Sequence, residues 1–328
     1  MMIRVHQKNC PIFVLLVLYS IICTAKWYKI KDSVNVKWSL RRKEFVGFMS
    51  QEYVGIDAGG TLSKIVYTNG GEWGYKKIAT DRVGEIREWI YEQFTNPHIH
   101  ITGGKAGVFL QELSGAAKNV NEFEATCEGV NWLLEQNGLL TQIGSRFMVT
   151  NVGTGTSIHY VQQDAYERIG GSGMGGGTLL GLSYLLTGED HYDKILELGK
   201  NGQGEGLNVT VADIYSHETP PISGDLTASN FGNAANRKEQ SFSKEDYIAA
   251  IVRMIGETIT TMSVQAAERL KTDAIIYIGS TFSGHDTLKD IIKGYTKLRG
   301  KQAFFLEYGE YSGAIGALLN NGLKKATL

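Results

Sequence analysis

The sequence predicts an α/β protein whose main body is built from two similar halves. Apolar segments of strand length alternate with helical segments from residue 53 to residue 320, which is typical of α/β folds. A strand that is interrupted by glycines and hydroxyl residues, and then continues as a second strand, occurs at 53–67 and again at 146–163. Each pair opens roughly half of the body, so we expect the two halves to face one another across a cleft.

The elements of the first half follow from local signals. A helix is predicted at 121–137, because Asn121 suits the N-cap and Gly138 suits the position that ends a helix. The other elements expected in this half are the strand pair at 53–67, a strand at 73–79, a helix at 82–95 and a short buried strand at 98–104.

The second half contains the longest predicted helix, at 243–271, where Ser243 and Asp246 are spaced as a variant capping box. The stretch 218–232 is interpreted as an ordered loop, and no repeat is short enough for a solenoid. The other elements expected here are the strand pair at 146–163, a glycine run at 170–177 that opens an apolar helix at 178–186, a strand at 273–280, a helix at 286–293, a strand at 303–308 and a closing helix at 311–320.

Composition argues against a disulfide-rich protein, a zinc-motif protein and a nucleic-acid-binding protein. Of the 328 residues 42% are apolar, which suffices for a substantial core, and 40 glycines against 4 prolines indicate many close backbone approaches. The three cysteines, Cys10, Cys23 and Cys127, form neither a disulfide framework nor a zinc motif. The main body has no basic patch, so no nucleic-acid partner is expected.

The turn in the first strand pair carries candidate phosphate-binding residues. Gly59 and Gly60 lack Cβ atoms, so successive N–H groups can curl around an anion, and Thr61 and Lys64 add donors. Asp57 at the end of the strand can hold Mg²⁺ through water. Taken alone, this turn fits a plain tight hairpin equally well, and it is not the Walker motif G-x-x-x-x-G-K-[ST].

A second turn of the same kind, NVGTGTS at 151–157, stands at the corresponding place in the second half. The hairpin interpretation must then apply twice, so phosphate binding by two facing loops is favoured. The glycine run that follows matches the dinucleotide fingerprint at Gly171, Gly173 and Gly176, but no clear ribose-binding acid lies about 20 residues later. We interpret this glycine run as a helix N-terminus that binds an anion, and we expect the ligand to be a nucleotide.

Acidic residues gather at the start of the helix predicted at 121–137. Glu122, Glu124 and Glu128 can simply interact favourably with the helix dipole. Alternatively, one of them is a general base for a hydroxyl nucleophile, and the spacing does not choose between Glu122 and Glu124. Arg168, just before the glycine run, can clamp a carboxylate or phosphate or lie solvated on a strand. The scattered histidines predict no metal site.

Together these motifs resemble a known family. GIDAGGTLSK and NVGTGTS are similar to the two phosphate loops of the acetate kinase, sugar kinase, Hsp70 and actin superfamily. With NEFEA, RIGGSGMGGGT, SGDLTASNFG, YIGSTF and YSGAIGAL in order, the body from Val54 to Leu319 resembles the type II pantothenate kinases of staphylococci and bacilli. The resemblance implies a duplicated actin-like ATPase fold of the ribonuclease H-like kind, with ATP in the cleft between two lobes. It also implies a homodimer that uses ATP and Mg²⁺ to phosphorylate the primary hydroxyl of pantothenate to 4'-phosphopantothenate, the first step of coenzyme A biosynthesis.

The resemblance assigns roles to single positions. Glu122 matches the general base of the family, and Glu124 stands where bacterial relatives often have aspartate, which does not disturb the base. Asp57 would lie near Mg²⁺, Arg168 matches an arginine of the substrate pocket, and Tyr295 a tyrosine that reaches into the neighbouring subunit's pocket. The positions implied to contact ATP, with the last two at its adenosine end, are Gly59, Gly60, Thr61, Leu62, Ser63, Lys64, Thr154, Gly176, Gly177, Thr178, Leu179, Leu180, Tyr192 and Ser280.

The N-terminal residues 1–48 differ from the body and have no counterpart in the family pattern. They hold nine Lys and Arg against two Asp and Glu, whereas the remainder holds 24 against 32. An apolar run at 11–25 follows a basic start and ends in Cys-x-Ala, which imitates a secretory signal. At fifteen residues it is short for a membrane span, which takes about 20. A signal peptide, a short membrane anchor and upstream codons translated from a wrongly assigned start all stay open.

We favour the wrongly assigned start, because the chain that bears the motifs begins directly after Met49 and the expected chemistry needs cytosolic nucleotide. The protein is then expected to be cytoplasmic, with no membrane partner unless 11–25 is a true anchor. The expected organisation is an extension at 1–48, a first lobe at 49–145 with the first phosphate loop and Glu122, and a second lobe at 146–328 with the second loop, the adenosine site and the dimer helices.

Two rival functions stay open. A sugar kinase or an activator ATPase can use the same fold, since a fold does not fix the substrate, although the cysteine cluster of some sugar kinases is missing here. A nucleotide-binding sensor without turnover is the rival outside enzymology. A Glu122→Gln variant separates a kinase from a sensor, because only a kinase has turnover to lose.

Overall fold

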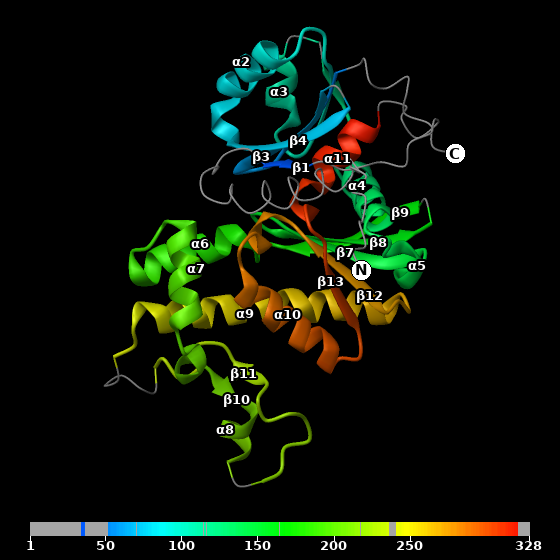
Figure 1. Cartoon of the computed structure of the whole chain (residues 1–328). Coiled ribbons are helices and arrows are strands. Elements are labelled where there is room, and N and C mark those ends of the chain that lie inside the picture. Colours follow the sequence, from blue (N-terminus) through cyan, green and yellow to red (C-terminus); the bar gives the residue numbers. More distant parts are fainter. Residues whose placement is uncertain are drawn as a thin grey trace, which may run out of the picture.

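The computed structural model describes residues 34–36, 52–69, 71–113, 115, 117–163, 165–216, 218–235 and 241–320. In this part of the chain two α/β lobes lie one above the other, and two helices cross between them (Figure 1). The apolar run at 11–25 lies outside the described residues. No helix in the part of the chain that the structure describes is both long and apolar enough to span a bilayer.

The first lobe is centred on a six-stranded mixed sheet with the order β1-β4-β3-β2-β5-β6. Strands β2, β3 and β4 form an antiparallel meander, and β5 and β6 continue the sheet parallel to β2. At the edge, β1 from the N-terminal extension pairs antiparallel with β4. The strands are β1 (Val34–Val36), β2 (Tyr53–Ala58), β3 (Leu62–Asn69), β4 (Glu72–Ala79), β5 (His98–Thr102) and β6 (Ala117–Asn119).

The second lobe repeats this arrangement in a five-stranded sheet with the order β13-β12-β7-β8-β9. Again three strands form an antiparallel meander, and two later strands add in parallel on the other side. Its strands are β7 (Arg146–Val152), β8 (Thr156–Gln162), β9 (Ala165–Ser172), β12 (Ala274–Ile278) and β13 (Gln302–Phe305). The duplication predicted from the two glycine turns is therefore confirmed.

Helices cover the outer face of each sheet. On the first sheet, Ile86 and Ile90 of α2 pack with Phe109 of α3 over the apolar side chains of β2 and β5. On the second sheet, Ile255 of α9 belongs to the cluster that contains Met148 of β7. These helices are α2 (Val83–Gln93) and α3 (Ala106–Glu112) on the first lobe, and α6 (Gly176–Thr187), α7 (Tyr192–Asn201), α9 (Lys244–Arg269) and α10 (Asp286–Leu298) on the second.

The two helices between the sheets, α4 (Glu122–Gln136) and α11 (Ser312–Leu319), are exchanged between the lobes (Figure 1). Helix α4 follows the first sheet in the chain, but its Val130 packs with Phe147 of the second sheet. Helix α11 closes the second half, but its Ile315 packs with Val66 of the first sheet. The inner face of each sheet is thus covered by a helix from the other half.

Glycines allow this crossing to be close. A Cβ atom on Gly129 of α4 would collide with the carbonyl oxygen of Ser312, and a Cβ atom on Gly316 of α11 would collide with that of Ala125. Backbone therefore packs directly on backbone at two points, which fixes how the lobes are joined and where the cleft between them opens.

Several elements were not predicted from the sequence. The part of the chain before α9 forms a protruding arm, which carries β10 and β11 as a short antiparallel pair (Figure 1). Part of the stretch 218–232, interpreted as a plain loop, is strand β11. The unpredicted elements are β1, β6, β9, β10 (Val209–Thr210), β11 (Thr227–Ser229), α3, α5 (Leu140–Ile143), α7, α8 (Val211–Tyr215) and the 3-10 turns η1 (Thr80–Arg82), η2 (Gly204–Leu207), η3 (Ser280–Phe282) and η4 (Gly309–Tyr311).

The predicted helix caps are confirmed. Asn121 accepts hydrogen bonds from the backbone N–H groups of Phe123 and Glu124, so α4 begins at Glu122. Ser243 and Asp246 form both hydrogen bonds of a capping box at the start of α9. The first of these caps places Glu122 at the mouth of the cleft.

Candidate active site

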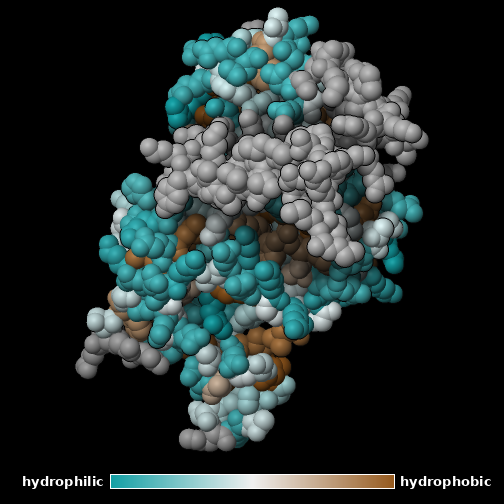
Figure 2. All heavy atoms as spheres, in the orientation of Figure 1, coloured by the Kyte–Doolittle hydropathy of each residue, from teal (hydrophilic) through white to brown (hydrophobic). Residues whose placement is uncertain are grey.

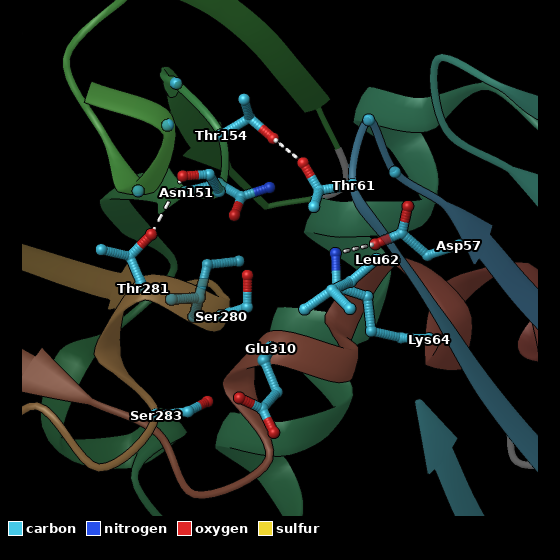
Figure 3. Close-up of a pocket in the computed structure, with 18 of the residues that line it drawn as sticks. Asp57, Thr61, Leu62, Lys64, Asn151, Thr154, Ser280, Thr281, Ser283 and Glu310 are labelled. Atoms are coloured by element: carbon cyan, nitrogen blue, oxygen red, sulfur yellow. Dashed lines mark hydrogen bonds and ion pairs between the residues drawn. The ribbon is translucent and has the colours of Figure 1, made fainter. Parts of the chain in front are cut away.

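A cleft of about 740 Å³ opens between the two lobes. Figure 3 shows polar side chains from both lobes pointing into the space. The lining combines both glycine turns with the starts of α4, α6 and α11: among others Asp57, Gly59, Gly60, Thr61, Leu62, Lys64, Lys77, Glu122, Asn151, Thr154, Ser157, Gly176, Gly177, Leu180, Tyr192, Ser280, Glu310 and Gly313.

The first glycine turn joins β2 to β3 and carries opposite charges on facing strand residues. Asp57 pairs with Lys64 in the register of the two strands, and Lys64 Nζ lies 3.4 Å from Asp57 Oδ2. Behind the turn, the Thr80 hydroxyl donates to the carbonyl oxygen of Gly59 over 3.0 Å. A Cβ atom on Gly59 would lie 2.7 Å from the Leu62 carbonyl oxygen, so glycine is needed for this tight turn.

The second glycine turn joins β7 to β8 on the other side of the cleft. Its loop is held from behind by Thr281, whose hydroxyl donates to the carbonyl oxygen of Gly153 over 2.9 Å. The two turns meet where Thr61 Oγ1 and Thr154 Oγ1 lie 3.3 Å apart, as Figure 3 shows. An elongated ligand can therefore be gripped from both lobes at this point.

The start of α6 supports the second turn. The backbone N–H groups of Gly176 and Gly177 donate to the carbonyl oxygens of Gly153 and Thr154, over 2.8 and 2.9 Å. A Cβ atom on Gly175 would lie 2.8 Å from the Thr154 carbonyl oxygen, so the glycine run allows this close packing. These two N–H groups thus hold the loop, while Gly176 and Gly177 still line the cleft.

Of the acids at the start of α4, Glu122 lines the cleft. Burial raises the pKa of Glu122 above its ordinary value, and the Asp57 carboxylate raises it further. Lys64 and Arg168 act in the opposite direction on the same pKa. Both Glu122 and the neighbouring Glu124 are exposed residues, but Glu124 is not part of the lining, so the two acids left open by the sequence differ in their position relative to the cleft.

Arg168 lies beside the start of α4. It stands on β9 opposite His159 of β8, and its guanidinium carbon lies 5.8 Å from the centre of the Phe123 ring. Arg168 is not part of the cleft lining. It is exposed at the margin of the cleft, next to Glu122 and Phe123.

Four other residues of the predicted set lie away from the lining, each for a local reason. Ser63 points away from the cleft and bonds to Thr80 over 3.0 Å, because successive side chains of a strand alternate. Leu179 is 1% exposed in the core of the second lobe, and the Thr178 hydroxyl donates to the Gly173 carbonyl oxygen over 2.6 Å. Tyr295 lies on α10, where its hydroxyl donates to Glu257.

Some residues that shape the cleft were missed from the sequence. Lys77 of β4 and Glu310 of η4 both line it, and Lys77 Nζ lies 2.5 Å from Glu310 Oε1. Thr80 and Thr281 anchor the glycine turns. Thr80 is a single threonine without a pattern around it, whereas Thr281 belongs to the motif YIGSTF, which gave a signal that could have found it.

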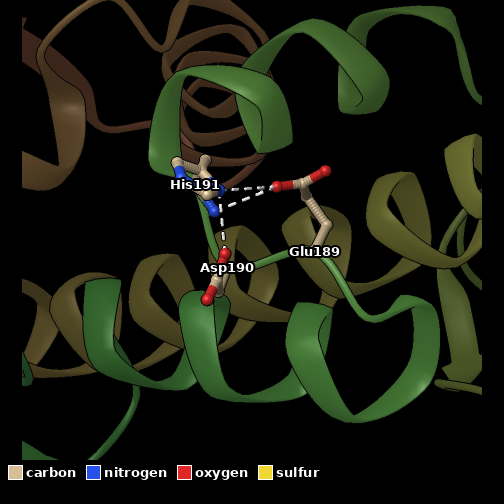
Figure 4. A group of neighbouring side chains, drawn as sticks. All are labelled: Glu189, Asp190 and His191. Carbon is tan, nitrogen blue, oxygen red and sulfur yellow. Dashed lines mark hydrogen bonds and ion pairs between the residues drawn. The ribbon is translucent and has the colours of Figure 1, made fainter.

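A separate group of potential metal ligands, Glu189, Asp190 and His191, lies just before α7 (Figure 4). The backbone N–H of His191 donates to Glu189 Oε1 over 3.0 Å, and His191 Nδ1 lies 2.8 Å from Asp190 Oδ1. Acids before a helix start interact favourably with its dipole, which explains the group without a metal ion.

Comparison with known proteins identifies the family. The family model described as Fumble matches residues 75–320. A type II pantothenate kinase of Staphylococcus saprophyticus subsp. saprophyticus is 41% identical over 265 residues, which cover 81% of this chain and 98% of that protein. A type II pantothenate kinase of Bacillus cereus is 45% identical over 276 residues, which cover 83% of this chain and 99% of that protein. The chain belongs to the type II pantothenate kinase family.

Membership of this family confirms the resemblance stated from the motifs and the expectation of an enzyme. Solved structures agree on the fold. Component A of the (R)-2-hydroxyglutaryl-CoA dehydratase of Acidaminococcus fermentans has a TM-score of 0.55 and 17% identity over 85% of this chain and 100% of that one. The activator of the 2-hydroxyisocaproyl-CoA dehydratase from Clostridium difficile has a TM-score of 0.55 and 14% identity over 84% and 96%. The chain therefore has the two-lobed, duplicated actin-like fold that was expected.

Proposed function

We propose that the protein transfers the γ-phosphoryl group of ATP to the primary hydroxyl of pantothenate, which gives 4'-phosphopantothenate and opens coenzyme A biosynthesis. One observation carries the proposal: Glu122, a carboxylate with a raised pKa, opens into the same cleft as the two facing glycine turns and the Asp57–Lys64 pair. Phosphoryl transfer needs positioning, charge neutralisation and one group that orients the acceptor. The names of the curated relatives support pantothenate as that acceptor.

ATP would lie across the contact between the two turns. Thr61 and Thr154, 3.3 Å apart, offer hydroxyl donors from opposite lobes, and the turns present backbone without side chains in the way. Gly176 and Leu180 of α6 line the same cleft, and Tyr192 and Ser280 lie on the side where we place the adenosine. The Tyr192 hydroxyl donates to the Thr281 carbonyl oxygen over 2.7 Å, which fixes this wall of the cleft.

Mg²⁺ would accompany ATP, and Asp57 would hold it through water. The residues around Asp57 fit a hydrated ion, because glycines flank both carboxylate oxygens. A Cβ atom on Gly103 would lie 2.8 Å from Oδ1, and one on Gly313 would lie 3.2 Å from Oδ2. Carboxylate and phosphate oxygens with several waters are the ligand set that Mg²⁺ prefers, and the bound ion would neutralise charge on the phosphates.

Glu122 would act as the general base that takes the proton from the attacking hydroxyl. Its raised pKa makes it a better proton acceptor than an ordinary glutamate once it is ionised. Lys64 would balance the charge that develops on the transferred group from the Asp57 side of the cleft. Closure of the lobes over the substrates would keep water from acting as the acceptor.

Arg168 would hold the carboxylate of pantothenate, since it is exposed beside Phe123 at the mouth of the cleft. Tyr295 would reach the pocket of a second subunit in a homodimer. Its position on α10, outside the lining of the described cleft, supports a role between subunits rather than in its own site.

Apolar residues on the surface also support the homodimer. Ile214 and Ile222 on the protruding arm are 62% and 56% exposed. Figure 2 shows apolar residues near the base of the arm. Exposed apolar residues in one region of a protein often mark a contact with a partner.

The test is a coupled assay of ADP formation with pantothenate, glucose and N-acetylglucosamine as alternative acceptors. We expect turnover with pantothenate and none above background with either sugar. Turnover with a sugar in place of pantothenate would exclude the proposal in favour of a sugar kinase on the same fold. ATP binding without turnover on any acceptor would favour the sensor.

A further inference from the structure

Strand β8 presents a serine and a histidine on the side of the sheet that faces α4. Ser157 and His159 are two residues apart, so their side chains point to the same face, as does that of Val161. Val161 packs in the cluster that contains Val130 of α4, which identifies the face. Ser157 lies at the cleft end of this row and lines the cleft.

His159 is buried behind Ser157 and bonded to it. Its Nε2 lies 2.9 Å from Ser157 Oγ, and the residue is 1% exposed. Its Nδ1 has no hydrogen-bond partner among the described residues. The imidazole also packs against Phe123, with ring centres 5.1 Å apart. The histidine is thus held by one polar contact, and that contact is to a residue of the cleft.

The protonation state of His159 follows from its surroundings. Burial lowers the pKa of His159 to about 4, and the positive charge of Arg168 acts in the same direction. The imidazole is therefore neutral at pH 7 and carries one N–H. Buried donors are left unpaired less often than buried acceptors. The tautomer that leaves no buried N–H unpaired carries the hydrogen on Nε2, which then donates to Ser157 Oγ, with Nδ1 as a bare acceptor.

This hydrogen bond determines what Ser157 can do. Because its oxygen already accepts from His159, the hydroxyl hydrogen of Ser157 is free to point into the cleft. We propose that His159 is a positioning residue, which fixes the Ser157 hydroxyl as a hydrogen-bond donor to the acceptor substrate. The inference rests on the proposed function and adds to it a specific contact with a hydroxyl or amide carbonyl oxygen of pantothenate.

The neighbours of the pair place it on the acceptor side of the cleft. Arg168 stands opposite His159 in the pairing of β8 with β9, so both side chains share one face. The ring of Phe123 packs against both of them, and Phe123 directly follows Glu122 in α4. Phe123 therefore connects Glu122, its neighbour in the chain, with Arg168 and with His159, which holds Ser157.

The test is a double-mutant cycle on the full chain, with KM for pantothenate and for ATP measured separately. His159→Phe removes both ring nitrogens and keeps a flat ring against Phe123. We expect KM for pantothenate to rise about 10-fold, the loss of one oriented hydrogen bond, while KM for ATP changes less than about 2-fold. Ser157→Ala is expected to give the same rise. The double variant is expected to show about 10-fold as well, because both changes remove one interaction.

A conservative variant separates positioning from packing. His159→Gln keeps an amide donor, so KM for pantothenate is expected to return to within about 3-fold of the unmodified protein. If His159→Phe does not fold, Ser157→Ala and His159→Gln decide, and an unchanged KM for pantothenate in Ser157→Ala overturns the inference. So does a double variant in which the two effects multiply to about 100-fold, or a KM for ATP that rises in step. An unmodified protein that does not phosphorylate pantothenate overturns the proposed function as well.

Discussion

The two glycine turns that face each other across the cleft have the same support. Each joins antiparallel strands, and each is anchored from behind by a threonine hydroxyl that donates to the carbonyl oxygen of the first glycine. Thr80 donates to Gly59 over 3.0 Å, and Thr281 donates to Gly153 over 2.9 Å. The two threonines lie at the ends of strands that do not correspond in the duplicated sheets, so similar anchors come from different places in the fold.

The turns differ in charge. Two residues before the first glycine stands Asp57, which pairs with Lys64 across β2 and β3. At the same places in the second lobe stand Asn151 and Ser157, which pair across β7 and β8. The duplicated frame therefore carries an ionised pair at the first turn and a neutral hydrogen-bonding pair at the second. In the proposed function, the first turn would neutralise charge and the second would orient neutral groups.

The largest effect on kcat should follow from substitution of Glu122, the acid that the first half of the chain contributes to the cleft. Glu122→Gln is expected to lower kcat by about 10²- to 10⁴-fold, because it removes a proton acceptor while ATP binding stays near normal. Steady-state kinetics and ATP titration check this. Glu124→Gln, an exposed neighbour outside the cleft lining, is the matched control and should stay within about 2-fold. Equal losses in both variants would contradict the role of Glu122.

A smaller effect is expected from neutralising the charged turn. Lys64→Met should lower kcat/KM for ATP by about 100-fold, since one positioned charge in the cleft is lost. Lys77→Met is the matched control, because Lys77 also lines the cleft from the first lobe but pairs with Glu310 rather than with Asp57 of the first turn. We expect less than about 10-fold for the control. If the two lysines prove equivalent, the difference between the turns does not depend on Lys64.

The comparison can also be tested by giving the neutral turn a charge. Asn151→Asp should raise KM for ATP about 10-fold, because a carboxylate then faces the phosphates from the second lobe. Asn151→Ser removes the same amide without adding a charge and should change KM by less than about 3-fold. The ratio of the two variants measures the effect of charge alone, and a ratio near one would show that the second turn tolerates either sign.

The smallest expected effect is a shift in pH dependence. Since burial and Asp57 raise the pKa of Glu122, the base becomes protonated, and kcat/KM falls, at a higher pH than for an ordinary glutamate. Lys64 lowers the same pKa, so Lys64→Met should move this acid limb to still higher pH. Profiles of kcat/KM against pH for both proteins check the direction. A limb that moves to lower pH in Lys64→Met would be inconsistent with this electrostatic coupling.

The sequence predicted those parts of the site that depend on local signals. The strand pairs around both turns, the cap at Asn121 and the capping box at Ser243 follow from residues that are close in the chain. The side-chain direction of Ser63 also follows from local geometry: if Leu62 and Lys64 point into the cleft, Ser63 between them points away.

Other features depend on contacts between distant segments and gave little signal. Thr281 anchors Gly153, which is 128 residues away, and Lys77 pairs with Glu310 from another lobe. The N–H groups of Gly176 and Gly177 suited an anion until the fold placed the carbonyl oxygens of the second turn against them. In each case the residue type is compatible with several partners, and only the tertiary packing determines which partner it has.

The exchange of α4 and α11 has a consequence for the synthesis of the chain. The first sheet is complete in sequence at residue 119, but the helix that covers its inner face spans Ser312–Leu319. On the ribosome, Val66 and its neighbours must therefore wait for nearly the whole polypeptide before they are buried. The amino-terminal lobe is the first to be translated and cannot be the first to be finished.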